Sequence, residues 1–307
     1  MTASLPQGEA ERRAAHRTGL IHGFGAYVLW GLLPLYFKLF PHVSSVETVA
    51  HRIVWSVAFL AIVMTATGLF PSFLRDLRRP RIVGALSLSA LFIAINWLVY
   101  IWAVNNDHVL AGSLGYFLNP LVNILLGMVF LHERLRRTQV VAVAIAAAGV
   151  AVLAAGELQT LWISVTLAMS FALYGLVRKL TPVPATVGLA VETLVLLLPA
   201  LAALGWFAAH GTLAFGRDGL QSALLIGTGA VTSVPLILFA GAARRLPLIT
   251  LGLIQYVGPT LQFLAGYFLL GEPLTTARLI SFGLIWVALA LFVGDGLRAA
   301  RRAGQQL

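Results

Sequence analysis

Few ionisable side chains interrupt the long apolar runs of this chain, and those that do are the first candidates for chemistry. Glu47, His51 and Trp55 follow one another at intervals of four residues, so a helix would place them on one face. Arg52 would point partly to the side of that face. These four side chains are candidates for a substrate or proton site. Glu192 lies inside another apolar run and is a plausible proton carrier.

Each of these residues also has a purely structural explanation. The segment from Glu47 to Arg52 could be an interfacial helix end, with Arg52 reaching toward the head groups. Glu192 could line the watery end of a pore or hydrogen-bond to a neighbouring helix. The functional alternatives matter because an ionisable group near the middle of a bilayer costs ~2.5 to 3.5 kcal/mol on insertion scales.

Amide and aromatic side chains within the apolar runs form a second group of candidates. Tyr116, Asn119 and Asn123 are spaced by three and four residues and would form one polar stripe on a helix. Asn96 and Tyr100 show the spacing of four in an earlier run. The other members of this group are Tyr174, Gln255, Tyr256 and Gln262. The structural alternative for the amides is hydrogen bonding between helices, which contributes only about 0.6 kcal/mol per contact. The structural alternative for the aromatic rings is a position that faces lipid.

Four prolines inside apolar runs are hinge candidates: Pro34, Pro120, Pro235 and Pro259. A proline leaves the carbonyl one turn earlier without its helical partner. Irregular backbone at membrane depth is tolerated mainly where it lines a cavity.

The amino-acid composition indicates that all these residues belong to a chain embedded in lipid. Of 307 residues, 59% are hydrophobic and 10% are charged, and the mean hydropathy is +0.91. A soluble globule is excluded, because so much apolar surface must face lipid. The chain has no cysteine, which excludes thiol catalysis and thiolate metal sites. Neither a metal site nor a nucleotide-binding motif nor another cofactor is expected.

Ten runs are long enough, or nearly so, to cross a hydrocarbon core as helices of about 20 residues. They are 19–40, 46–69, 82–104, 109–131, 138–155, 161–179, 186–209, 221–242, 248–270 and 277–294. The net charge of +10 is concentrated in short clusters at alternate ends of these runs, which is typical of membrane flanks and not of a nucleic-acid-binding face. The pattern predicts a multi-pass membrane protein with both termini cytoplasmic.

An internal repeat divides the chain into two halves. Shifting residues 110–135 by 139 positions pairs Pro120 with Pro259, and a shift of about 145 pairs Glu47 with Glu192. We expect a cytoplasmic tail (1–18), repeat 1 (19–155), repeat 2 (156–295) and a second cytoplasmic tail (296–307). Five spans per repeat is an odd number, so the predicted fold is an all-α membrane protein of ten transmembrane helices in two inverted repeats, an arrangement typical of secondary transporters.

The repeat is not symmetric in its charges. The positions in repeat 2 that correspond to His51 and Arg52 are Leu196 and Leu197. Packing symmetry therefore does not require the two charged side chains, which favours a functional role for them.

Five stretches resemble the RarD proteins of the EamA family, in the drug/metabolite transporter superfamily. They are HRIVWS at 51–56, NWLVYIWAVNN at 96–106, SLGYFLNPLVN at 113–123, SFALYGLVRK at 170–179 and LIQYVGPTL at 253–261. The resemblance implies an inner-membrane permease whose helices 1–4 and 6–9 surround a central cavity, with helices 5 and 10 outside it, where a second protomer could pack. RarD proteins are described as chloramphenicol-sensitivity proteins. This chain departs from such relatives at Ala111, where they usually carry an acidic residue, so no charged role is carried over to that position.

The sequence thus predicts a secondary active transporter of a small organic solute such as an amino acid, an amine or an amphenicol-like molecule. An ion gradient is the expected energy source, because no nucleotide-binding motif is present. Protons are the expected coupling ion. A passive channel is the alternative, although it would need a continuous polar lining. A membrane-embedded enzyme is disfavoured, because the lone His51 is too little for a catalytic site. Glu133 and Glu272 are expected to cap helix starts.

Topology reporters test the odd number of crossings in each repeat. We expect reporters fused to the two chain ends to lie in one compartment, the cytoplasm. Finding the ends in different compartments would contradict the inverted repeat and the assignments that depend on it.

Overall fold

The protein is described by a computed structural model that covers residues 7–131, 137–156, 158–243, 245–246 and 254–304. Within these residues it is helical and has no β-strand. The helices are α1 (Gln7–Phe37), α2 (Ser45–Ala66), α3 (Phe70–Leu77), α4 (Pro80–Asn105), α5 (Val109–Leu131), α6 (Arg137–Gly156), α7 (Leu158–Leu180), α8 (Ala185–Ala209), α9 (Gly219–Ala243), α11 (Val257–Leu264), the π-helix η1 (Ala265–Leu269) and α12 (Thr276–Gly304).

Eight helices in the described part of the chain are long and apolar enough to cross a membrane, and Val109–Asn119 is a shorter apolar helix. The protein is therefore a multi-pass membrane protein. The predicted ninth span, 248–270, is represented by α11 and η1, while residues 248–253 lie outside the described residues. The short helix α3 was not anticipated. Pro71 lies in its first turn, where a proline costs no hydrogen bond, and its Phe73 is buried.

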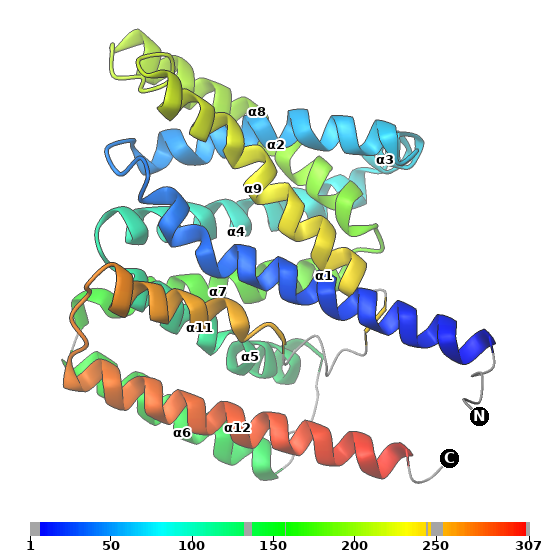
Figure 1. Ribbon diagram of the computed structural model, residues 1–307, viewed down its shortest axis with the longest axis vertical. Coiled ribbons are helices and arrows are strands. Elements are labelled where there is room, and N and C mark those ends of the chain that lie inside the picture. Colours follow the sequence, from blue (N-terminus) through cyan, green and yellow to red (C-terminus); the bar gives the residue numbers. More distant parts are fainter. Residues whose placement is uncertain (1–6, 132–136, 157, 244, 247–253, 305–307) are drawn as a thin grey trace, which may run out of the picture.

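The long helices run side by side across the molecule, and both termini lie at the same end (Figure 1). α2 packs against α8 and α9, and α4 packs against α7 and α8. α1 packs against α9 and α11, while α5 packs against α7. α6 and α12 pack against each other and form one edge of the molecule (Figure 1).

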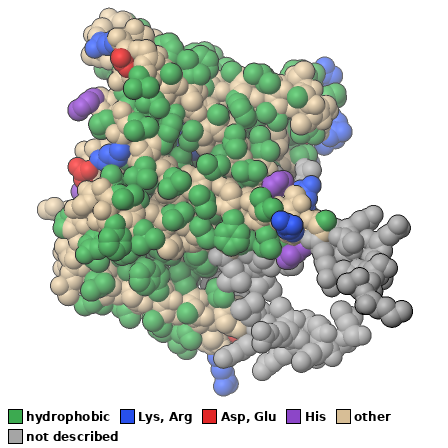
Figure 2. Space-filling model, in the orientation of Figure 1, with side chains coloured by type: hydrophobic (Ala, Val, Ile, Leu, Met, Phe, Trp, Pro, Cys, Tyr) green, Lys and Arg blue, Asp and Glu red, His purple; other side chains and the backbone are tan. Residues whose placement is uncertain are grey.

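Apolar side chains cover the sides of this bundle. Figure 2 shows hydrophobic side chains over most of one face, with Lys, Arg, His and acidic side chains gathered toward the ends of the helices. Ile62, Leu198 and Phe268 are among the large apolar side chains that are about 70% exposed or more (70%, 76% and 69%). Such exposure is unfavourable in water and expected against lipid, which agrees with the composition.

Several helix pairs approach so closely that only glycine fits between them, among them α5 with α7 and α1 with α11. A Cβ atom on Gly115 of α5 would lie 2.8 Å from the backbone oxygen of Ser164 in α7. A Cβ atom on Gly31 of α1 would lie 2.6 Å from Cβ of Leu261 in α11. Small residues at such contacts let membrane helices gain van der Waals contact that bulkier residues would prevent.

Glu272 joins the two halves of the chain. Its carboxylate lies in the loop after η1 and accepts hydrogen bonds from the backbone N–H groups of Val109 and Leu110, the latter at 2.9 Å. These two groups have no partner inside α5, because they belong to its first turn. Burial raises the pKa of the Glu272 carboxyl, while the two N–H groups oppose that rise. The predicted capping of a helix start is thus observed for Glu272, and Glu133 lies outside the described residues.

Gly115→Ala tests the close contact between α5 and α7. We expect it to lower the free energy of unfolding by about 1–3 kcal/mol, because the new methyl group meets the backbone of α7 and cannot be relieved by a rotamer change. The change is read from the midpoint of thermal unfolding in detergent. Gly84→Ala is the matched control, since a Cβ at Gly84 meets no atom within 4 Å. Equal midpoints for the two variants would contradict the close approach.

Candidate functional site

A buried guanidinium lies where helices from both halves of the chain meet. Arg52 of α2 is 4% exposed, and its Nε donates a hydrogen bond of 2.7 Å to Thr232 Oγ1 of α9. The guanidinium carbon lies 4.2 Å from the centre of the Trp97 ring of α4 and 6.0 Å from that of Phe37 at the end of α1. Cation–π contacts of this kind partly replace the water that the charge has lost.

No carboxylate within the described residues forms an ion pair with Arg52. The acidic groups of neighbouring helices are engaged elsewhere, Glu47 with the loop before α9 and Glu192 with α4 and α7. The side chain that sequence reasoning placed at an interfacial helix end, or in a solute site, is therefore a buried cation held by a neutral hydroxyl and aromatic rings.

Asn96 organises the aromatic wall beside this cation. Its Nδ2 donates to the backbone oxygen of Leu167 and to Ser170 Oγ, both at 3.1 Å, and its Oδ1 accepts from the Tyr116 hydroxyl at 2.9 Å. The Tyr116 ring centre lies 5.5 Å from that of Tyr100, and both tyrosines are close enough to Arg52 to interact with it electrostatically. The Tyr100 hydroxyl is buried and has no hydrogen-bond partner in the part of the chain that the structure describes.

Glu47, His51 and Trp55 face the loop before α9. Glu47 Oε1 accepts hydrogen bonds from the backbone N–H groups of Ala214 (2.8 Å) and Phe215 (3.2 Å). The His51 ring stacks on Phe215 with centres 4.9 Å apart, and its Nε2 lies 3.7 Å from Glu47 Oε1. The Trp55 ring centre is 6.2 Å from that of Phe215. We call these five residues the α2–loop cluster; they tie α2 to the second half of the chain.

Glu192 of α8 contacts side chains of α4 and α7. Ser89 Oγ of α4 donates to Glu192 Oε1 at 2.6 Å, and the Tyr174 hydroxyl donates to Oε2 at 3.5 Å. Arg178 Nε is 3.6 Å from Oε1, and a Cβ on Gly188 would overlap this guanidinium. We call Ser89, Tyr174, Arg178 and Glu192 the α8 cluster; it ties α8 to the first half of the chain.

The remaining candidates lie around α5 and α11. Asn119 is buried and its Oδ1 has no partner, while Gln262 donates from Nε2 to the backbone oxygen of Trp30 at 3.1 Å. Gln255 is half-buried just before α11. Tyr256 stacks on Phe117, with ring centres 6.3 Å apart, in a separate apolar cluster near α12, so it is not brought to Arg52. The side chains of Asn123 and Pro120 lie outside the described residues.

The other three prolines differ in their positions. Pro34 and Pro235 lie inside α1 and α9, where a kink is possible, and Pro259 lies in the first turn of α11. The break that precedes α11 falls at the residues just before it, so Pro259 marks a helix start. Its carbonyl accepts a hydrogen bond of 2.7 Å from Ser113 Oγ of α5.

Sequence reasoning missed several members of these clusters. Arg178 is not among the predicted site residues, although its spacing of four from Tyr174 places both on one face of a helix. Thr232, Ser89 and Phe215 carry no such signal, because a single hydroxyl or aromatic residue in an apolar run is common. Only the packing of α9 and α4 against α2 and α8 brings them to charged partners.

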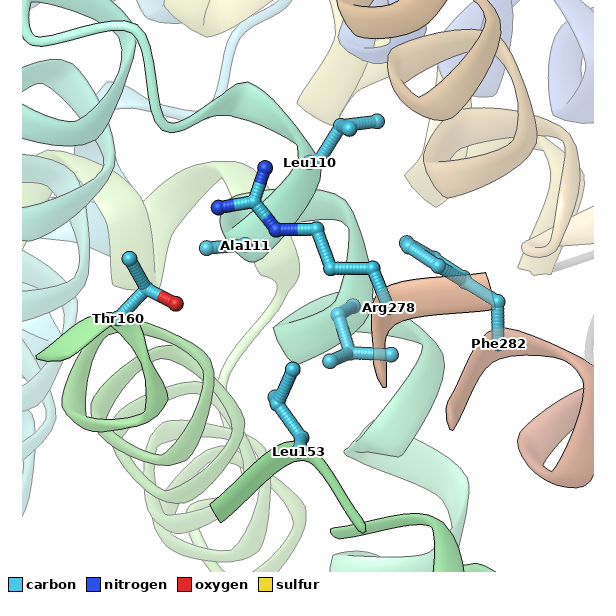
Figure 3. Close-up of a pocket in the computed structure, with 7 residues that line it drawn as sticks. Leu110, Ala111, Leu153, Thr160, Arg278 and Phe282 are labelled. Carbon is cyan, nitrogen blue, oxygen red and sulfur yellow. The ribbon is translucent and has the colours of Figure 1, made fainter. Parts of the chain in front are cut away.

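A small pocket elsewhere takes no part in this arrangement. It has about 170 Å³ of empty space and is lined by Leu110, Ala111, Leu114, Leu153, Thr160, Arg278 and Phe282 (Figure 3). Arg278 donates from Nη1 to the backbone oxygen of Pro273 at 2.9 Å. Within the described residues, no group of three His, Cys, Asp or Glu side chains is placed to hold a metal ion.

Comparisons with known proteins agree with this architecture. The profile of the EamA-like transporter family matches residues 17–155. A RarD protein of Streptomyces exfoliatus is 46% identical over 292 residues, which cover 95% of this chain and 93% of the relative. An uncharacterized transporter of Pseudomonas aeruginosa is 47% identical over 293 residues, covering 94% of this chain and 97% of the relative. A crystal structure that is 22% identical shares the fold, with a TM-score of 0.61 over 89% of this chain and 96% of that chain. The chain therefore belongs to the EamA-like transporter family of the drug/metabolite transporter superfamily, with RarD proteins as its relatives.

Proposed function

We propose that this protein is a secondary active transporter that moves a small organic solute across the bacterial inner membrane by alternating access, driven by protons. Membership of a transporter family supports transport in general. The observation that carries the finer proposal is the pair of clusters around Glu47 and Glu192, each of which ties one half of the chain to the other, the first at the loop before α9 and the second at α4.

The pairing of helices supports two inverted five-helix repeats. In the proposed repeats, α1, α2, α4, α5 and α6 correspond to α7, α8, α9, α11 and α12. If the two halves are exchanged, the contact between α5 and α7 becomes the contact between α11 and α1, and both contacts are present. In the same way, the contact between α4 and α7 becomes the contact between α9 and α1. The contact of α2 with α9 becomes that of α8 with α4, while α2 with α8 and α6 with α12 map onto themselves. A pseudo-twofold axis between the halves explains this set of contacts.

The two glutamates occupy equivalent positions in these repeats. Glu47 of α2 contacts the loop before α9, and Glu192 of α8 contacts Ser89 of α4, which is the counterpart of α9. An inverted repeat places such equivalent contacts near opposite membrane surfaces. Each cluster can then hold one side of the transport path closed, and loosening one while the other remains formed opens the path to one side.

Glu192 is the proposed coupling group. Its carboxylate interacts with Arg178 and accepts a hydrogen bond from Ser89. Protonation of Glu192 removes the negative charge that attracts Arg178, and it makes the carboxyl group a weaker acceptor for the Ser89 hydroxyl. The α8 cluster is weakened as a result. Proton binding would thereby be linked to the state of one gate, which is the requirement for coupling a solute to a gradient.

The discrete, helix-bound polar clusters also favour a transporter over a passive channel. A channel needs a continuous polar lining, whereas Glu47 and Glu192 here belong to two discrete clusters that are held by partners within the protein. We further propose that both termini are cytoplasmic and that a second protomer packs on α6 and α12, the pair at the edge of the molecule (Figure 1).

Proteoliposomes with an imposed pH gradient test the coupling, with amino acids, amines and amphenicols as candidate solutes. We expect saturable, gradient-driven flux of a solute in wild type, and a loss of at least about tenfold in Glu192→Gln, because an uncharged amide cannot carry the proton. Solute exchange without a gradient should persist in this variant.

Asp218→Asn is the matched control, since it makes the same change from carboxylate to amide at an exposed loop position. Wild-type driven flux in both Glu192→Gln and His51→Ala would contradict the proposed sites. Flux that fails to saturate and ignores the gradient would instead favour the passive channel.

A further inference from the structure

The charge of Arg52 lacks an acidic partner in a place where such a partner is needed. The side chain is 4% exposed, well within an apolar helix that crosses the membrane. Among the described residues its hydrogen bond is the one from Nε to Thr232, and no acceptor in that part of the chain binds its two terminal nitrogens. A buried cation without a counter-ion is costly, because the attraction of an anion usually offsets the loss of water. The N–H groups of the two terminal nitrogens, which lie in one plane, are therefore available to a partner from outside the described residues.

Several buried hydrogen-bond donors that are close to Arg52 in the chain, or on the helices that contact it, have no hydrogen-bond partner among the described residues. Trp55 Nε1 and Ser56 Oγ are three and four residues further along α2, and Ser233 Oγ is next to Thr232 in α9. The Tyr100 hydroxyl is on α4, the helix whose indole ring lies on the guanidinium. All four groups can donate a hydrogen bond, and indole N–H can only donate. Unused donors thus occur on each of α2, α4 and α9, the helices that provide Arg52 and its partners.

The walls of this region are aromatic. Trp97 and Phe37 lie against the guanidinium, and Tyr116 is held in place by Asn96 beside Tyr100. Flat apolar surfaces of this kind bind the rings or hydrocarbon of an organic solute and leave little room for the hydration shell of a small inorganic ion. The forked guanidinium is the group that pairs best with the two oxygens of a carboxylate.

We propose that Arg52 is the binding residue for the carboxylate of the transported solute, an organic acid whose apolar part lies against Phe37, Trp97, Tyr100 and Tyr116. The inference rests on the proposed transport function and specifies its substrate class. Each protein chain has one such site, because the corresponding position in the second repeat is Leu197. The bound acid completes the ion pair that is missing in the empty protein.

Binding to the purified, full-length protein in detergent tests this assignment without any membrane or gradient. The probes are benzoate, phenylacetate and indole-3-acetate, each compared with its neutral primary amide, and sodium chloride at the same ionic strength. We expect the acids to raise the midpoint of thermal unfolding and to change tryptophan fluorescence, because Trp97 lies on the guanidinium. The amides and chloride should do neither.

Three variants separate charge, geometry and folding. Arg52→Met should abolish the response to the acids while unfolding at the wild-type temperature or above, since removing an unpaired buried charge is not destabilising. Arg52→Lys should weaken acid binding at least about tenfold, because a point charge replaces the bidentate fork. Thr232→Val should weaken it by a smaller factor, because Thr232 orients the fork through Nε.

Several results would overturn the assignment. They are an acid response that Arg52→Met retains, equal responses to acids and amides, an equal response to chloride, or no response of wild type to any of the acids. The results that would overturn the proposed transport function are different from those that would overturn the Arg52 site. Acid binding that depends on Arg52 without gradient-driven flux of that acid would overturn proton coupling and leave the site, whereas driven flux of amines without acid binding would overturn the site and leave the transporter.

Discussion

A charged group that lies between apolar helices in a bilayer must find its partners inside the protein, because lipid offers none. This constraint explains the arrangement of the polar residues in the structure. Glu47 takes two backbone N–H groups, Glu192 takes a hydroxyl and a guanidinium, and Glu272 takes the first N–H groups of α5. Each carboxylate contacts the opposite half of the chain, so the same interactions that satisfy charge also hold the halves together.

In a transporter, the contacts that pair a buried charge can also control the movement of the helices. A contact that closes one end of a transport path must be strong enough to exclude solute and weak enough to be lost in the transport cycle. Hydrogen bonds from a carboxylate to two N–H groups, or to one serine and one arginine, meet this requirement, because they can be broken without unfolding a helix. The glycine contacts of Gly115 and Gly31 differ from these hydrogen bonds, since they depend on close packing between helices.

Arg52 differs from the three glutamates because its partners do not neutralise it. Thr232 and the aromatic rings reduce the cost of burying the cation, but none of them carries a negative charge. A site that becomes electrostatically complete only with solute present gives a transporter a reason to change shape on binding, because the solute then alters the balance between its states.

The sequence by itself determined the membrane character of the chain, the helical spans and the position of most polar residues along them, because hydropathy and helical spacing are local properties. It placed Glu47, His51 and Trp55 on one helix face and marked Glu272 as a cap. It could not assign partners: Phe215 lies 164 residues from His51 in the chain, Thr232 lies 180 from Arg52, and Ser89 lies 103 from Glu192. Which of the candidate residues meet, and which, like Tyr256, turn toward another cluster, was decided only by the tertiary structure, because the packing of helices distant in the chain determines what each buried charge can reach.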